Sequence, residues 1–278
     1  MRTISKIIIG AITLISAASC GNNTKTLLPN VSGKAGEVII VIGKDNWEGN
    51  LGNEIGSLLA RDCEYLPQRE PLYSLVNLSP GAFSDMFKIH RNIVIFNIDS
   101  TVTKQGVVYR TDVWAHPQCV IQVNAACADS AIAVLSRNGE NITGAIEQAE
   151  RNRVIANTLL YEESKLGDVV AKMIGGRIHF PIGYTLKKVT DDFIWIADEK
   201  QYSTQGVFVY KYPAVGKDPF SEENIIAKRN AFLKEYVPAT AEDSYMTTSV
   251  FVKPGIKFMK YHDLDFVETR GLWEVYND

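Results

Sequence analysis

EVIIVIG, residues Glu37–Gly43, is an unbroken run of apolar and mostly β-branched residues after its first glutamate. Such a run is typical of a strand that is buried on both faces, as in a parallel sheet with helices on either side. A second run, NIVIFNI, occupies Asn92–Ile98. Between them, apolar residues at helical spacing over 51–61 precede a strand-like segment at Leu72–Leu78 and a short helix after Pro80. This β-α-β-α-β order predicts a mixed sheet covered by helices.

The middle of the chain predicts two more strands and then a long helical region. The strands are expected at Gly106–Trp114 and Cys119–Val123. A first helix is expected over 129–137, and Asn138–Gly139 would end it, because glycine commonly follows the last turn of a helix. Over 141–160 apolar residues fall on one helical face and charged residues on the other, which predicts further helix. After a break at Gly167, the helix is expected to continue over 168–174 and to end at Gly175 and Gly176.

The last third again alternates between strands and a helix. A helix is expected after Ser221, a favourable N-terminal capping residue. The expected strands are 177–186, 193–197, 206–212, 246–252 and 264–275. The sequence therefore predicts an α+β fold with mixed β-sheets covered by helices, and with a long central helical region between N-terminal and C-terminal sheet-forming parts.

Residues 1–19 have the features of a secretory signal peptide, with a basic start, an apolar run over 7–18 and small residues before Cys20. The run is shorter than the roughly 20 residues that a helix needs to cross a bilayer. The small residues around Cys20 resemble the lipobox of bacterial lipoproteins, although Ala17 stands where leucine is usual. The resemblance implies cleavage before Cys20 and acylation of this cysteine, which would anchor the chain permanently. A plain cleaved signal peptide with an incidental cysteine is the alternative.

These patterns divide the chain into five parts. Residues 1–19 form the signal peptide, and residues 20–36 form a lipidated N-terminus with a polar tether. An N-terminal α/β part covers 37–139, a long helical connector covers 140–176, and a C-terminal α+β part covers 177–278.

Charge and cysteine content limit the possible partners. The formal net charge is −3 and no basic run is present, so the electrostatic signature of a nucleic-acid-binding protein is missing. The expected location is the bacterial cell envelope, at the outer membrane facing the periplasm. In that oxidising compartment Cys63, Cys119 and Cys127 form either one disulfide and one thiol or three buried thiols.

The sequence has no phosphate-binding loop, dinucleotide-binding glycine motif, zinc-protease motif or nucleophile elbow, and it predicts no cofactor and no metal. The catalytic candidates are His262 and Asp265, which could form a base and its orienting carboxylate or hold a divalent ion. A polar loop before the last strand is the simpler interpretation of this segment. His116, Cys119 and Cys127 match no common zinc-site spacing.

An arginine and the aromatic residues offer two further hypotheses. Arg91 could bind an anionic group, cap the edge of a sheet or pair with Asp85. The aromatic residues could line a cleft for a glycan or peptide, but core packing is the commoner use of such residues in strands. The aromatic set is Trp47, Trp114, Trp195, Trp273, Tyr184, Tyr202, Tyr210 and Tyr212.

Several stretches of the chain resemble an uncharacterised family of bacterial lipoproteins, the DUF4837 family. They are LLPNVSGKAGEVIIVI (27–42), WEG (47–49), LPQREP (66–71), HRNIV (90–94) and ETRGLWEV (268–275). The resemblance covers most of the chain after the signal peptide and implies a lipoprotein with an α+β fold. It implies no activity and no catalytic residue, because the family has no assigned function.

We therefore expect a lipid-anchored, noncatalytic envelope protein that faces the periplasm and binds a protein or glycan partner. An envelope hydrolase that acts on a cell-wall or imported polymer is the alternative, and it would require two titratable side chains facing each other across a pocket. The hydrolase hypothesis requires the side chains of His262 and Asp265 to face each other across a pocket, whereas the binding hypothesis does not.

Overall fold

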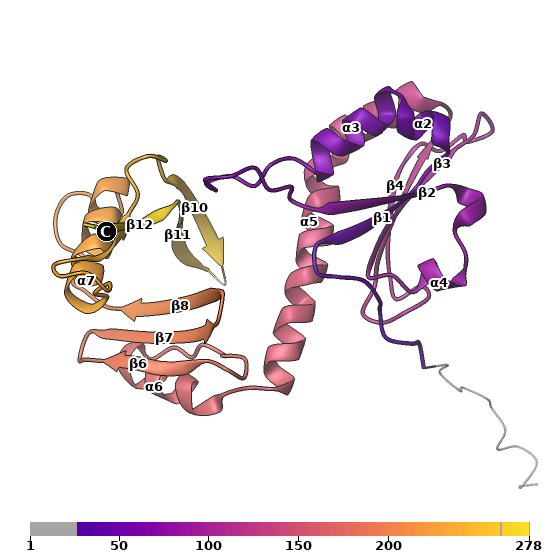
Figure 1. Ribbon diagram of the computed structural model, residues 1–278. Coiled ribbons are helices and arrows are strands. Elements are labelled where there is room, and N and C mark those ends of the chain that lie inside the picture. Colours follow the sequence, from indigo (N-terminus) through magenta and orange to yellow (C-terminus); the bar gives the residue numbers. More distant parts are fainter. Residues whose placement is uncertain (1–26, 262, 278) are drawn as a thin grey trace, which may run out of the picture.

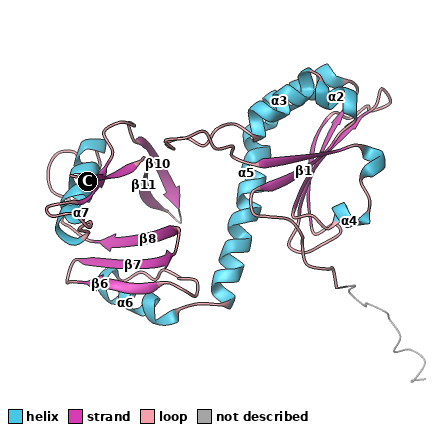
Figure 2. Ribbon diagram, viewed as in Figure 1, coloured by secondary structure: helices cyan, strands magenta, loops and turns pink. Residues whose placement is uncertain are grey.

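The computed structural model describes residues 27–261 and 263–277, which form two lobes connected by one long helix (Figure 1). The N-terminal lobe comprises residues 27–160, and the C-terminal lobe comprises the described residues from 161 onward. Each lobe combines strands with helices, as Figure 2 shows. The prediction of an α+β fold with a long central helix is confirmed.

The N-terminal lobe is built on a five-stranded sheet in the order β2-β1-β3-β5-β4, in which β4 runs antiparallel and the others run parallel. The apolar run of β1 is buried on both faces, as predicted. Val38 and Ile40 pack on the side of α3 and α5, whereas Ile39 and Val41 pack on the side of α4. The elements of the sheet are β1 (Glu37–Val41), β2 (Ser74–Leu78), β3 (Asn92–Ile98), β4 (Gly106–Thr111) and β5 (Cys119–Ala125). The helices are α2 (Lys44–Glu48), α3 (Asn50–Leu59), η1 (Pro80–Ala82), α4 (Asp85–Lys88) and α5 (Ala128–Leu160).

Helix α5 runs unbroken through Asn138 and Gly139, so the predicted helix end at these residues is wrong. Gly139 is buried against α3, and a β-carbon there would lie 2.8 Å from Leu58 Cδ1. The glycine therefore allows close packing of two helices instead of ending one. The helix also crosses the sequence-based boundary between residues 139 and 140, and the division of the chain into parts stays a prediction.

The C-terminal lobe is built on a three-stranded antiparallel meander with one helix on each face. Phe180, Ile194 and Ile196 pack on the α6 side, whereas Phe193 packs with Leu233 on the α7 side. The elements are α6 (Ser164–Ile174), β6 (Thr185–Val189), β7 (Phe193–Lys200), β8 (Ser203–Tyr210) and α7 (Glu222–Tyr236). Two strand pairs complete the lobe: β9 (Tyr245–Thr248) with β12 (Trp273–Tyr276), and β10 (Gly255–Tyr261) with β11 (Leu264–Arg270).

Two strand predictions in this lobe are wrong. The predicted strand over 177–186 is largely an irregular segment, whose backbone bonds to residues 161–163 through the Phe180 carbonyl and the Ile182 amide, and the strand begins only at Thr185. The predicted strand over 264–275 is divided at Gly271 into two strands that pair with different partners. Strand β10, the partner of β11, was not predicted.

A projecting segment, residues 61–72, leaves the N-terminal lobe between α3 and β2 and reaches the C-terminal lobe beside β10 (Figure 1). We call this segment the arm. Its two sides are joined by backbone hydrogen bonds, from Cys63 to the Glu70 carbonyl (2.7 Å) and from Leu72 to the Arg61 carbonyl (2.8 Å). The arm gives the lobes a second connection besides the chain that follows α5.

Within residues 27–261 and 263–277, none of the helices combines the length and the apolar composition that crossing a bilayer requires.

Candidate functional site

The residues proposed from sequence as catalytic or lipidated do not form a described site. Cys20 and His262 lie outside the described residues. Asp265 lies on β11, where its carboxylate is 3.6 Å from Lys260 Nζ and 85% exposed. The pairing of His262 with Asp265 therefore stays a prediction.

The cysteines and His116 are also dispersed. Cys119 and Cys127 lie near opposite ends of β5, the former buried and the latter exposed, and both are free, as is Cys63. Burial raises the pKa of Cys119 to about 11. Nδ1 of His116 lies 2.8 Å from Asp112 Oδ2. No group of three histidine, cysteine or acidic side chains suited to a metal occurs among the described residues.

Arg91 belongs to a buried ionic network at the amino-terminal ends of β1, β3 and β5. Its Nη2 donates to Glu150 Oε2 (2.7 Å), whereas Asp85, the sequence-based partner, pairs with Lys88. Arg153 of α5 joins the network, and burial lowers the pKa of this guanidinium. The network fastens α5 to the sheet, which is a structural role for the HRNIV stretch.

Most of the aromatic residues considered for ligand binding are used in packing. Trp47 packs against the core under α3, and Trp114 makes an edge contact with Phe83 across 5.7 Å. Trp195 packs in the core under α7, while Trp273 of β12 is half-exposed. The tryptophans therefore lie in four separate places and do not line one cleft.

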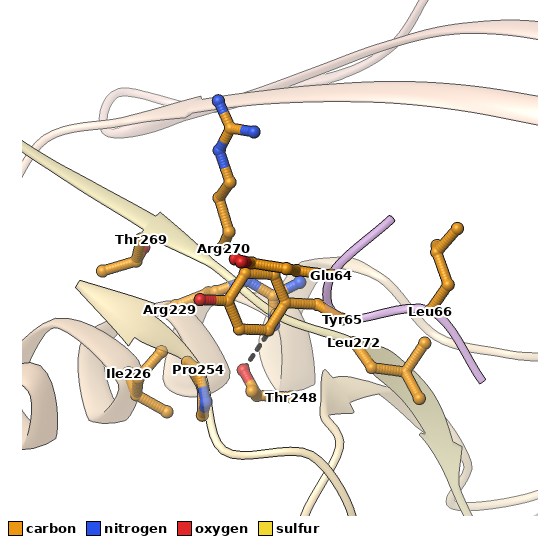
Figure 3. A pocket seen from close by; sticks show the side chains of 11 residues that line it. Glu64, Tyr65, Leu66, Ile226, Arg229, Thr248, Pro254, Thr269, Arg270 and Leu272 are labelled. Atoms are coloured by element: carbon orange, nitrogen blue, oxygen red, sulfur yellow. Dashed lines mark hydrogen bonds between the residues drawn. The ribbon is translucent and has the colours of Figure 1, made fainter. Parts of the chain in front are cut away.

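A cavity of about 360 Å³ lies where the arm meets the C-terminal lobe (Figure 3). The arm contributes Glu64, Tyr65 and Leu66. The C-terminal lobe contributes residues from α7, β9 and the turns around β11: Ile226, Arg229, Thr248, Pro254, Thr269, Arg270, Gly271 and Leu272. We call this cavity the arm pocket. Its size falls within the range of pockets that bind small molecules, about 300–1,000 Å³.

Gly255 makes room for the arm, and Gly271 allows a tight turn in the C-terminal lobe. Tyr65 has a positive φ of 66°, which is uncommon for a residue with a side chain, and this backbone turn projects its ring toward the C-terminal lobe. A β-carbon at Gly255 would overlap the Tyr65 hydroxyl. At Gly271, a β-carbon would lie 3.2 Å from Pro254, so the turn between β11 and β12 also lacks space for a side chain.

Two arginines give the arm pocket its positive charge, and they differ in their partners. Arg270 donates from Nη2 (2.8 Å) and Nε (3.1 Å) to one oxygen of Glu268. Arg229 is half-buried and donates from Nη1 to the Thr248 hydroxyl (2.7 Å). Burial lowers the pKa of Arg229, and no carboxylate of the described chain forms an ion pair with it.

A second cavity of about 350 Å³ lies on the other side of Tyr65 and extends to α5. Its charged side chains include two ion pairs: Arg151 with Glu147 on α5, and Arg270 with Glu268 on β11. The arginines of this second cavity are thus balanced by the protein, unlike Arg229 in the arm pocket.

The fold and the arm pocket define a two-lobed α+β protein with a ligand-sized cavity between its lobes. Residues 163–278 match the family described as Domain of unknown function (DUF4837), which confirms the predicted resemblance for this part of the chain. Residues 31–159 match a second family, Domain of unknown function (DUF8532), so the stretches WEG, LPQREP and HRNIV and residues 31–42 of the first stretch fall in that match instead. No curated protein and no solved structure matches the chain.

Residues from both matched segments line the arm pocket. The LPQREP stretch, which belongs to the arm, falls in the DUF8532 match, and ETRGLWEV falls in the DUF4837 match. Leu66 from the first stretch and Thr269–Leu272 from the second line the pocket. Sequence reasoning missed Tyr65 and Arg229, because a tyrosine in an irregular segment and an arginine on a charged helix carry no distinctive signal.

Proposed function

We propose that this protein is a noncatalytic, lipid-anchored envelope protein that binds its ligand in the arm pocket. The observation that carries the proposal is that both lobes contribute to one ligand-sized cavity, with charged, hydroxyl and apolar groups on its wall. Ligand sites are commonly found between lobes, where a few polar groups orient a ligand against apolar walls. The proposed partner in the envelope is the molecule that fills this pocket, either a small ligand or part of a protein or glycan.

The alternative, an envelope hydrolase, depends on Asp265 and His262. Asp265 lies outside the arm pocket, is paired with a lysine and is almost fully exposed, whereas a general acid or base is usually held in a partly buried site. Loss of polymer hydrolysis in His262→Ala, with an unchanged melting temperature, would support this alternative and contradict the noncatalytic proposal.

Anchoring through Cys20 is the part of the proposal that a single substitution tests. We expect protein extracted from membranes to lack residues 1–19 and to carry acyl mass on Cys20, since several acyl chains bind a bilayer permanently. Cys20→Ser should release the protein into the soluble fraction, whereas Cys63→Ser should leave it in the membrane. Intact-mass analysis and fractionation measure both results, and a soluble wild type with a free Cys20 thiol would refute the anchor.

Binding is tested by a thermal-shift screen of the detergent-solubilised protein with peptidoglycan fragments, glycans, peptides and lipids. A ligand at 100 times its Kd stabilises the folded state by about 2.7 kcal/mol, which raises Tm by several degrees. Tyr65→Ala, which opens the arm pocket, should abolish this rise. Tyr202→Ala is the control, because Tyr202 is a highly exposed tyrosine in the turn between β7 and β8. Stabilisation that is unchanged in Tyr65→Ala would place the ligand elsewhere and contradict the proposal.

A further inference from the structure

We infer that the arm pocket binds a small carboxylate with an apolar body, and that Arg229 is the counter-ion of the carboxylate. The inference rests on the proposed function, because it names the class of ligand for the same pocket. Three observations support it: Arg229 has no anionic partner in the described chain, hydroxyl and apolar side chains line the rest of the pocket, and the cavity has the size of a small ligand.

Arg229 is a half-buried cation without an anionic partner in the described chain. Its guanidinium donates to two neutral oxygens, Thr248 Oγ1 at 2.7 Å and Asn230 Oδ1 at 3.4 Å, and both bonds come from Nη1. Nη2 and Nε therefore have no acceptor among the described residues, and both nitrogens retain some accessible surface. A charge that is taken out of water without a partner destabilises the fold, so an anionic ligand on these two nitrogens would offset the cost.

None of the described carboxylates around the pocket forms an ion pair with Arg229. Arg270 is already neutralised by Glu268, and Glu222 of the same helix as Arg229 lies 3.6 Å from Lys253. Glu64 lines the pocket from the arm, but it forms no ion pair with Arg229. In Figure 3 the Tyr65 ring lies between Glu64 and Thr248, in front of Arg229. Arg229 is thus the arginine of the pocket wall that no carboxylate of the described chain pairs with, and a monoanion would neutralise it.

The hydroxyl and apolar side chains that line the pocket indicate the chemical class of the anionic ligand. The hydroxyl group of Thr269 can donate to a carboxylate, whereas the Thr248 hydroxyl already donates to Asn230 Oδ1 (2.8 Å). A carboxylate also matches the planar fork of a guanidinium. Apolar side chains form the other part of the wall: Leu66, Ile226, Pro254 and Leu272. One cation beside apolar walls fits a carboxylate on an apolar body better than a phosphate, which carries more charge and demands more donors.

N-acetyl-leucine and N-acetyl-leucinamide form a matched pair of probes, because they differ only in carboxylate against neutral amide. A set of N-acetylated apolar amino acids and their amides, with inorganic phosphate as a third probe, is titrated against the full-length protein in detergent. We expect one or more acids to raise Tm and to bind in calorimetry, and we expect the amides and phosphate to have no effect at the same concentration. Binding by no acid at millimolar concentration, or equal binding of acid and amide, would overturn the inference.

Arg229→Met keeps most of the apolar stem and removes the charge. A hydrogen bond to a charged group contributes about 1.5–3 kcal/mol, so the variant should bind the acid at least about tenfold more weakly. Without ligand it should melt at or above the wild-type temperature, because an unpaired half-buried charge is gone. Lys228→Met, on the neighbouring exposed position of α7, should bind like the wild type.

A purely structural arginine would give a different pattern. If Arg229→Met and the milder Arg229→Gln both melt far below the wild type without ligand, the arginine stabilises the fold and the inference fails. If a neutral ligand from the screen depends on Tyr65 but not on Arg229, the carboxylate inference fails while the proposed function stands. If binding depends on neither residue, both fail.

Discussion

Arg153→Met is expected to destabilise the protein by about 3–5 kcal/mol, the usual cost of breaking a buried ion pair. For domains of this size the loss corresponds to a fall in Tm of roughly 6–20 °C. The measurement is urea unfolding of the variant and the wild type, followed by far-ultraviolet circular dichroism.

The cost is large because Arg153 satisfies acceptors from three segments. Its Nε donates to the Pro117 carbonyl (2.9 Å), and its Nη2 donates to the Arg91 carbonyl (2.7 Å). Nη1 donates to Asn92 Oδ1 (3.0 Å) and lies 3.2 Å from Glu150 Oε1. The side chain is 8% exposed, so water cannot replace these donors when methionine is introduced.

Arg151→Met, two residues earlier on α5, is the matched control. The Arg151 side chain is 56% exposed and pairs with Glu147 on the helix surface. Exposed ion pairs of this kind contribute about 0.3–0.5 kcal/mol. Equal destabilisation by the two substitutions would show that the network does not fasten α5 to the sheet.

Gly52→Ala is expected to cost about 3 kcal/mol or more, at the upper end for overpacking. Gly52 is buried in α3, and a β-carbon there would overlap the backbone carbonyl of Trp47 in α2. Backbone atoms cannot move aside as a flexible side chain can, so α2 and α3 must separate. Thermal unfolding of the variant measures the effect.

Gly56→Ala tests whether this cost is steric. Gly56 lies one helical turn further along α3. Apart from its chain neighbours and the backbone of its own helix, no described atom lies within 4 Å of the place that a β-carbon would occupy. Alanine at this residue should stabilise the protein by about 0.5–1 kcal/mol, because alanine favours helix. A destabilised Gly56→Ala, or a neutral Gly52→Ala, would contradict the packing described for α3.

The sequence is most informative where burial determines both pattern and structure. The runs at β1 and β3 are recognisable because both faces of a central parallel strand are buried, which leaves an uninterrupted apolar signal. The capping serine before α7 is recognisable for a local reason, since the Ser221 hydroxyl accepts from the Asn224 amide. Such features depend on neighbours along the chain or on burial alone.

Features that depend on distant contacts escape prediction. Gly139 has the sequence signal of a helix end, but its role is set by Leu58 from another helix. The arm pocket is hidden for the same reason, because Tyr65 and Arg229 meet only when the arm reaches the other lobe. Neither residue carries a motif that marks it in advance.

The arm limits the ways in which the lobes can move. Chain connectivity at residues 161–163 and the contact of Tyr65 with Gly255 hold the C-terminal lobe at two separate points. A rigid body held at two points retains a single rotation, about the line that joins them. Any rotation of the C-terminal lobe that keeps both attachments is therefore a turn about that axis.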